Sequence, residues 1–580
     1  MNKRVQINSF CGGTSKLVDS SFLGFEESIN MYPETVESED SYTKKVLKGI
    51  DGFRSFTYTS FSGKKFFLAS KSPASSRNQG RPVVYYVEED KLHRLYEDGT
   101  DVFVARLGPD SVSPHVARLV GEVEFVETSG DPAFLVFCGY FFVNSTAKGE
   151  YHHYVFTFNL DTVDVGYADV PKISPLIMPS AFDHGGGIKP TKIAYLNYRL
   201  IVNDEGHDYI YWSELNKPDG VDDRHAFQQK LTRYTFTTKD GHQVTASDNQ
   251  YYPPAYGTYE DGTLQTEEVW MAALNNVKVD FRADNVQNIV ALDQCFIAFG
   301  TTSFQVFRWQ NSQYAPYVTS SKTSSVGLVS PEACAVLNGR VFFLGSGAVG
   351  TPGVYVAGEN GFEKVSTISV DQRLVSVNET DKAYAFSYSY KGHSFFVLTF
   401  YGEEDNFTLC YDAVEGTWHS RATMDDNGNL NYWSIRYAIN AYGNVIFSDN
   451  LAAGFYVFDK DSFVDPYGRP IPRIRTTGIK FDMMNDLIVR NLELITDNGA
   501  GKNLDVEPRV MLQVSMDGGF TWSNEKWVKS GKVGQRNFRT LWKDLGKGAR
   551  IAFRVKVTDP VPFNIATAML EYSPLKNRIF

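Results

Sequence analysis

The chain has 580 residues, of which 42% are hydrophobic and 22% charged, and its formal net charge is −11. This length exceeds one ordinary hydrophobic core, so we expect two or three folding units. The acidic balance argues against a dedicated nucleic-acid-binding protein, which usually carries a basic surface.

The N-terminal residues and the cysteines bear on the compartment. Residues 1–8 lack the apolar core of a signal peptide, and no run approaches the roughly 18 apolar residues of a membrane span. The five cysteines show no CxxC spacing and are expected to be buried thiols in a reducing compartment. We therefore expect synthesis in a cytoplasm and no membrane span.

Strand-like sequence dominates the chain. The 42 Phe, 33 Tyr and 47 Gly are typical of many short strands joined by tight turns. Seven hairpin-like units follow one another, each a β-rich run, a polar or Gly turn and a second β-rich run: 65–68 with 83–87, 134–142 with 154–158, 198–202 with 209–212, 295–299 with 304–309, 340–344 with 353–356, 394–400 with 407–411, and 444–447 with 454–458.

The spacing of these units, roughly 45–65 residues, is near that of propeller blades. One small twisted sheet cannot bury both of its faces, but a ring of such sheets can. We predict an all-β protein with a β-propeller of six to eight blades over 51–470. Residues 1–50 are predicted to form an N-terminal arm that packs on or joins the β-domains.

Two regions depart from the hairpin rhythm. A polar stretch at about 215–285 is predicted to be a long insertion on one face of the ring, and such loops are often functional. From about 471 to 580 we predict a separate β-sandwich-like domain. Its strand at 550–557 alternates, with Ile551, Phe553, Val555 and Val557 on one face.

A single Asp-box pattern, S-x-D-x-G-x-T-W, lies in this C-terminal domain. Its defining residues are Ser515, Asp517, Gly519, Thr521 and Trp522. We interpret it as a structural turn, in which the Asp side chain bonds backbone amides, Gly permits a positive φ and Trp packs underneath. Sialidases also carry such boxes, so a carbohydrate-binding or sialidase-like propeller is the alternative hypothesis. That class needs an arginine cluster, a Tyr nucleophile and acidic partners, which the sequence does not display.

No other motif indicates catalysis or a cofactor. The ten histidines form no HExxH pattern, and neither a P-loop nor a GxSxG motif occurs. Residues 425–429 form a turn signal without the downstream Glu of a calcium loop. We therefore predict no enzyme activity, no metal and no cofactor.

A basic stretch stands out within this acidic chain. Residues 525–556 hold ten positive side chains against Glu525 and Asp544, a local balance of +8. One interpretation is a solvated face. The other is a contact with an acidic neighbour or with DNA phosphate. The candidate contact residues are Arg536, Arg539, Arg550, Arg554 and Lys556.

Ordered short phrases, from about residue 10 to 570, carry a family resemblance. They include Cys11-Gly12-Gly13 and the run 29–34, then 299–303, 327–331, 342–345, 353–355 and 365–367, and later 411–412, 416–421, 448–449, 454–456, Trp542, 545–546 and 557–561. In this order they resemble the packaged-DNA stabilisation proteins of short-tailed bacteriophages, also called tail hub or nozzle proteins. Asp51-Gly52-Phe53, where that family often has Pro-Gly-Leu, and the 215–285 insertion depart from the pattern.

The resemblance implies a non-enzymatic virion protein of the phage tail, assembled in the bacterial host cytoplasm. It implies a homo-oligomer, a hexameric ring of β-propeller subunits below the portal and adaptor complex. Such a ring extends the DNA channel, lets double-stranded DNA pass transiently, helps to retain the packaged genome, and anchors tail needle, fibre or spike proteins. A scaffold propeller of a cellular complex would fit the composition but not the ordered phrases.

Overall fold

The computed structural model is nearly all-β, with 56% strand and 3% helix. It divides into two compact units, unit 1 (Met1–Lys64 and Leu328–Phe580) and unit 2 (Lys65–Gly327), and the sequence boundary at 327/328 falls within β26 (Val326–Leu328). The structure describes residues 3–16, 25–37, 44–73, 79–110, 114–144, 149–181, 185–214, 225–247, 259–272, 275–282, 284–312, 315–347, 350–359, 361–481, 485–497, 499–500 and 507–575.

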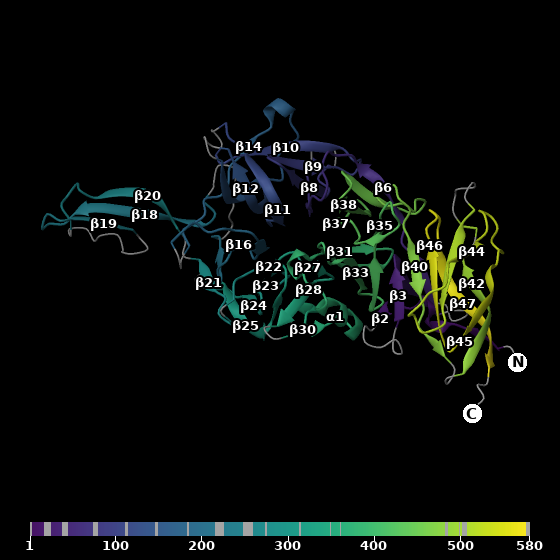
Figure 1. Cartoon of the computed structure of the whole chain (residues 1–580). Coiled ribbons are helices and arrows are strands. Elements are labelled where there is room, and N and C mark those ends of the chain that lie inside the picture. The colour runs from purple at the N-terminus through teal and green to yellow at the C-terminus, as the bar shows by residue number, and fades with distance from the viewer. Residues whose placement is uncertain are drawn as a thin grey trace. The chain divides into compact units, whose positions relative to one another are not determined.

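Unit 2 contains five sheets of three to five strands, and four of them carry the predicted hairpins (Figure 1). The first has the order β14-β10-β9-β8-β7 and the second β11-β12-β13, while the third and fourth are β15-β16-β17-β21 and β22-β23-β24-β25. Their bounds are β7 Phe66–Ala69, β8 Val83–Glu88, β9 Lys91–Leu95, β10 Asp101–Leu107, β11 Ala117–Glu127, β12 Phe134–Val143, β13 Glu150–Asn159, β14 Lys172–Ile173, β15 Ile193–Leu196, β16 Arg199–Asn203, β17 Tyr209–Trp212, β21 Asn276–Lys278, β22 Asn288–Ala291, β23 Cys295–Phe299, β24 Phe304–Trp309 and β25 Tyr317–Ser324; a 3₁₀ turn, η2, spans Tyr167–Asp169.

A further three-stranded sheet lies between β17 and β21 in sequence, inside the predicted insertion. It consists of β18 (Gln228–Thr237), β19 (Gln243–Ser247) and β20 (Gln265–Ala272), with β18 in the centre. In Figure 1 it stands apart from the other sheets of unit 2. The insertion is thus partly a regular sheet, while its segments 215–224 and 248–258 lie outside the described residues.

Unit 1 contains three more sheets of the same kind. β27 to β30 form one, β31 to β34 the next, and β37 to β39 together with β6 the third; the short pair β35-β36 lies between the last two in sequence. The bounds are β6 Gly52–Thr57, β27 Cys334–Leu337, β28 Arg340–Gly347, β29 Gly353–Gly358, β30 Gly361–Lys364, β31 Tyr384–Tyr390, β32 His393–Tyr401, β33 Asn406–Asp412, β34 Thr417–Arg421, β35 Thr423–Met424, β36 Leu430–Asn431, β37 Ile435–Ala441, β38 Asn444–Asp449 and β39 Phe455–Asp459; helix α1 spans Ile368–Val375 and η3 Thr380–Lys382.

All seven predicted hairpins are present as antiparallel strand pairs. They are β7/β8, β12/β13, β16/β17, β23/β24, β28/β29, β32/β33 and β38/β39. Each belongs to a different sheet. Six of these sheets have three to five strands, and the seventh group, β31–β34, is one end of an 11-stranded sheet, so seven strand groups of blade size carry the hairpins, within the predicted range of six to eight.

The last of these sheets is completed by a strand from near the N-terminus. β6 pairs with β39, with Phe53 opposite Phe458 and Gly52 opposite Asp459. Gly52 packs closely on the backbone of Ser462, since a Cβ at this position would lie 2.5 Å from the Ser462 carbonyl oxygen. This close approach explains the glycine of the Asp51-Gly52-Phe53 phrase.

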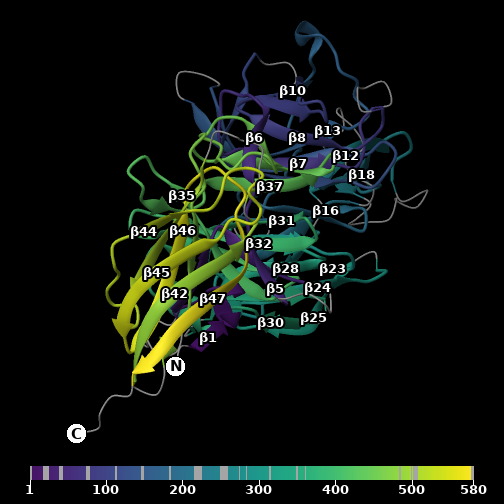
Figure 2. The same cartoon turned by 90° about the vertical axis from the view of Figure 1, so that its right-hand side faces the viewer.

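The C-terminal residues form a two-layered sandwich with strands from the N-terminal segment (Figure 2). One layer has the order β4-β5-β47-β42-β45 with β1 beside β47, and the other runs β34-β3-β40-β46-β43-β44, continuous with the β31–β34 sheet. The bounds are β1 Lys3–Gln6, β2 Ser15–Lys16, β3 Phe25–Ile29, β4 Met31–Thr35, β5 Lys45–Gly49, β40 Arg473–Thr476, β41 Lys480–Phe481, β42 Asp486–Thr496, β43 Arg509–Ser515, β44 Lys526–Lys529, β45 Thr540–Gly548, β46 Arg550–Val557 and β47 Asn564–Leu575; η1 spans Asn8–Cys11.

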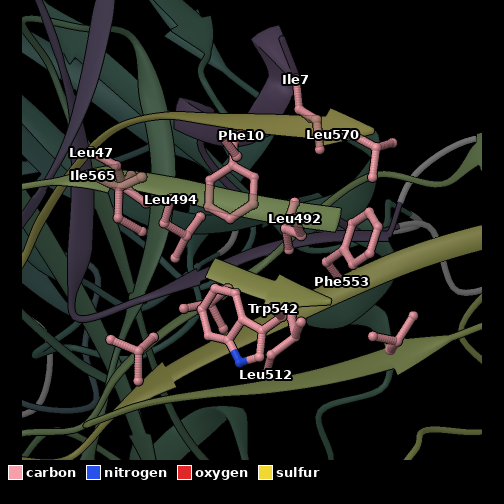
Figure 3. Close-up of a cluster of buried hydrophobic side chains, with 14 of the residues drawn as sticks. Ile7, Phe10, Leu47, Leu492, Leu494, Leu512, Trp542, Phe553, Ile565 and Leu570 are labelled. Atoms are coloured by element: carbon pink, nitrogen blue, oxygen red, sulfur yellow. The ribbon is translucent and has the colours of Figure 1, made fainter. Parts of the chain in front are cut away.

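A single hydrophobic core fills the sandwich (Figure 3). Ile551, Phe553, Val555 and Val557 of β46 all belong to it, as the alternation of that strand predicts. Ile7 and Phe10 from the N-terminal segment and Leu47 from β5 are buried in the same cluster. The predicted N-terminal arm therefore contributes both strands and core residues to the sandwich.

Candidate partner interface

The Asp-box residues close the turn between β43 and β44. Asp517 accepts hydrogen bonds from the Thr521 amide (3.0 Å) and the Thr521 hydroxyl (2.6 Å). The Ser515 hydroxyl donates to Asp517 (2.7 Å) and accepts from the Gly519 amide (2.7 Å). Gly518 and Gly519 have φ of +86° and +93°, which L side chains rarely adopt.

These hydrogen bonds determine the ionisation of the turn carboxyl. The Thr521 hydroxyl first, then the Thr521 amide and Ser515, lower the pKa of Asp517 to about 2. A carboxylate bound in this way is an acceptor held by its own turn. It is a poor candidate for a general acid or a nucleophile.

Two of the predicted contact arginines support this turn from β46. The Gly518 amide donates to the Arg550 carbonyl (2.9 Å). The Arg554 guanidinium lies over the Trp522 ring, 4.1 Å from its centroid, and burial lowers the pKa of Arg554. Arg550 and Arg554 are both half-buried; Arg550 holds the turn through its backbone carbonyl, and Arg554 through its side chain.

Much of the basic stretch is paired with acidic residues of the same unit. Among the described residues, the ion pairs that follow involve four of its ten cations, and three of the acids lie outside the stretch. The pairs are Lys529–Glu507 (2.8 Å), Arg539–Glu493 (2.6 Å), Lys547–Asp486 (2.7 Å) and Lys556–Glu525 (3.9 Å). The local balance of +8 therefore overstates the charge that this surface presents. Sequence reasoning missed Glu493 and Asp486 because only the pairing of β42 with β45 brings them near.

Part of the stretch remains open to solvent. Arg536, in the loop between β44 and β45, and Lys543, on β45, are exposed and form no ion pair with any residue that the structure describes. Two large apolar side chains are exposed in the preceding hairpin, Phe520 (73%) and Trp527 (53%). Exposed aromatic side chains and exposed cations that form no ion pair within the described residues are typical of a protein-binding surface.

The described residues show neither a metal centre nor a membrane helix. No group of three or more His, Cys, Asp or Glu among them could hold a metal ion. In the same part of the chain, no helix has the length and apolar character that a bilayer crossing requires.

Seven strand groups of blade size followed by a sandwich define the chain as a β-propeller protein with an appended β-sandwich. A family model described as the β-propeller of bacteriophage P22 Gp10 matches residues 181–463, and one described as the β-sandwich of the same protein matches 473–573. The chain belongs to the bacteriophage P22 Gp10 family, and the predicted fold class is confirmed. Membership identifies it as a structural protein of a bacteriophage tail and as a virion component.

Curated proteins and solved structures give no further information on function. Curated proteins yield no significant match. Among solved structures, an exo-β-1,3-galactanase from Phanerochaete chrysosporium is 9% identical, over 77% of this chain and 95% of that chain, with a TM-score of 0.22. Kluyveromyces lactis Hsv2 is 9% identical, over 60% of this chain and 82% of that chain, with a TM-score of 0.23. An oligogalacturonate lyase in complex with manganese is 10% identical, over 75% of this chain and 97% of that chain, with a TM-score of 0.25. With TM-scores this low, none of them bears on the activity of this chain.

Proposed function

We propose that the chain is the nozzle, or hub, subunit of a short phage tail. In this proposal six copies form a ring below the portal and adaptor complex. The ring extends the DNA channel, helps to retain the packaged genome, and anchors the tail needle, fibre or spike proteins. The observation that carries the proposal is that both domains of one tail protein family match this chain in order, over 181–463 and 473–573.

The physical character of the chain supports a conduit. Small antiparallel sheets with dry aromatic and aliphatic cores are rigid modules, suited to holding partners at fixed positions. A net charge of −11 is compatible with DNA passage, because acidic surfaces repel phosphate and let a duplex slide without adhering.

We also propose that the subunit has no catalytic activity and is assembled in the host cytoplasm. The alternative of a carbohydrate-cleaving propeller rested on the Asp box. Both carboxylate oxygens of Asp517 are hydrogen-bonded within the turn, to Thr521 and Ser515. This arrangement supports the structural interpretation of the box and gives the carbohydrate hypothesis no site.

The basic stretch at 525–556, together with the exposed aromatics of the β43–β44 hairpin, is called the basic hairpin here and is our candidate for a contact between the ring and a neighbour. Arg536 and Lys543 are its available charges, and Phe520 and Trp527 its available apolar surface. The remaining residues of this acidic chain carry a net −19, since the whole chain is −11 and residues 525–556 are +8. A second copy of the chain is therefore a chemically suitable neighbour.

Phage particles that lack this chain test the proposal. Heads should package DNA but lose it after packaging, and purified chain added to such heads should restore retention. The measurement is the fraction of particles that keep nuclease-protected DNA, with a portal-deficient preparation as the control that packages none. Particles that retain their DNA and still carry the distal tail proteins would rule out the nozzle role.

A further inference from the structure

The first sheet of unit 2 carries three cations side by side. Arg106 on β10 stands opposite Lys91 of β9 on one side and Lys172 of β14 on the other. Residues directly opposite in register point to the same face of a sheet, where like charges repel. A row of this kind gains stability when an anion is bound against it.

A β-bulge places an aromatic ring on the same face. The register shifts between Phe103 and Ala105, so that Phe103 faces His93 while Arg106 faces Lys91. Val104 and Ala105 both point into the core of the sheet. Because of the extra residue, Phe103 and Arg106 share the outer face although they are three positions apart.

A pocket of about 410 Å³ opens beside this row. Its charged wall is formed by Arg106 and Lys172, and the rest is aromatic or aliphatic: Phe103, Pro114, Val116, Tyr167, Ala168 and Val170. The Tyr167 ring lies 5.5 Å from that of Phe103 and its residue is 70% exposed. The volume is in the range of small-ligand sites, and the exposed rim lets an extended segment enter from solvent.

Two acidic residues limit the charge that the pocket accepts. The Asp90 carboxylate lies 3.3 Å from Nε of Arg106. Burial lowers the pKa of Lys172, the Arg106 charge lowers it further, and the Asp110 carboxylate opposes this fall. With part of the positive charge already offset, a single carboxylate suits the site better than a multiply charged phosphate.

The position of Lys172 depends on a glycine. A Cβ on Gly108 would lie 1.9 Å from Cε of Lys172, so the lysine side chain crosses the space that a larger residue would fill. Substitution there displaces the flexible end of Lys172 while keeping its charge. Substitution of Gly108 therefore tests the position of the Lys172 side chain, and substitution of Lys172 itself tests its charge.

We propose that this pocket binds an amphipathic carboxylate, supplied by an acidic side chain next to a bulky apolar one in an extended segment of a partner protein. The carboxylate lies between Arg106 and Lys172, and the apolar side chain lies against Phe103 and Tyr167. This site goes beyond the proposed nozzle role, which names no binding site in unit 2.

Ligand-observed NMR on the full chain tests the site with three probes. N-acetyl-aspartyl-phenylalaninamide should bind, while its asparaginyl analogue and inorganic phosphate should bind at least about fivefold more weakly, since a charge-assisted hydrogen bond is lost or the charge is mismatched. Lys172→Met, Gly108→Ala and Tyr167→Ala should each weaken binding of the aspartyl probe about fivefold or more.

The matched control is Lys239→Met, which removes an exposed cation of unit 2 from the β18–β19 turn and should leave binding unchanged. Native hydrogen exchange of β10 first shows that each variant is folded. Tyr167→Ala is expected to fold because the Tyr167 side chain is largely exposed. Equal binding of the asparaginyl probe, competition by phosphate as strong as by the aspartyl probe, or binding insensitive to Lys172→Met and Tyr167→Ala would each overturn the proposal.

Discussion

Buried arginines join parts of unit 1 that are distant in sequence. The Arg475 side chain is fully buried and donates to the carbonyl oxygens of Phe10 (2.8 Å) and Gly13 (2.9 Å), to the Ser28 hydroxyl (2.9 Å) and to Glu26 (2.7 Å). One guanidinium thus fixes η1 and β3 to β40. Burial lowers the pKa of Arg475.

Arg475→Met should release the N-terminal strands. The loss leaves the Glu26 carboxylate and two carbonyl groups without their donor, which should cost about 3 kcal/mol or more. Hydrogen exchange of residues 8–11 and 25–29 should accelerate strongly, while Arg490→Met, at an exposed site on β42, should leave it unchanged. Equal protection in both variants would show that Arg475 does not anchor the segment.

The Asp-box carboxylate makes a pH-dependent contribution. Asp517→Ala should destabilise the β43–β44 turn by about 1–2 kcal/mol near neutral pH, the worth of hydrogen bonds to a charged acceptor. Because the folded pKa of Asp517 is lowered to about 2, its contribution is complete above the unfolded pKa and is lost as the pH falls through about 2.

The difference between wild type and Asp517→Ala in hydrogen exchange of β43 and β46 should therefore shrink below about pH 4. Asp426→Ala, an exposed turn carboxylate that makes no hydrogen bond within the described chain, is the control and should show no such difference. A difference that persists unchanged at low pH would exclude the assigned role of the carboxylate.

At the scale of elements, a turn explains one of the family-like phrases, 299–303. Asp284 accepts hydrogen bonds from the backbone amides of Thr301 (2.9 Å) and Thr302 (2.7 Å), and from both of their hydroxyls. Burial alone would raise the pKa of Asp284, but these hydrogen bonds outweigh it and the pKa is lowered. A Cβ at Gly300 would lie 2.4 Å from the Asp284 carboxylate, so this turn requires glycine.

Gly300→Ala should push Asp284 out of the turn between β23 and β24. We expect a loss of about 1–3 kcal/mol in the stability of that sheet, the usual cost of an overpacked site. Gly187→Ala, where the added Cβ would meet open space, should be neutral. Urea unfolding monitored by hydrogen exchange of β23 and β24 compares the two variants. Equal unfolding midpoints for Gly300→Ala and Gly187→Ala would show that position 300 does not require glycine.

Local sequence predicted the hairpins because a strand pair joined by a short turn is a local structure. The alternation in 550–557 and the aromatic runs near 134–158 needed no distant information. The pairing of β6 with β39 and the ion pairs of Glu493 and Asp486 with the basic stretch join residues far apart in sequence. No local pattern encodes them, so the basic stretch was predicted with too much available charge.

Because part of its charge is already paired, the basic hairpin is best tested at its exposed cations. Charge reversal at Arg554 would remove its contact with the Trp522 ring of the Asp box, so the informative variant is Arg536→Glu with Lys543→Glu. It should weaken assembly by an amount that decreases as salt rises, because exposed charges are screened. Lys460→Glu, an equally exposed reversal in unit 1, should leave assembly unchanged. Equal effects of both variants would show only a dependence on net charge.

For the whole molecule, we propose that the subunit forms one wall segment of a conduit. Its two family matches, its strand-built units and its acidic charge are all compatible with a ring that positions partners around passing DNA. In this account function depends on assembly and the single chain has little activity of its own.

The order of the ring is therefore the decisive measurement. Electron microscopy of the purified chain with portal and adaptor, or of the intact particle, should show a closed hexameric ring below the adaptor with a central opening wide enough for a DNA duplex. A chain that stays monomeric at high concentration, and that also fails to join portal–adaptor complexes, would contradict the account.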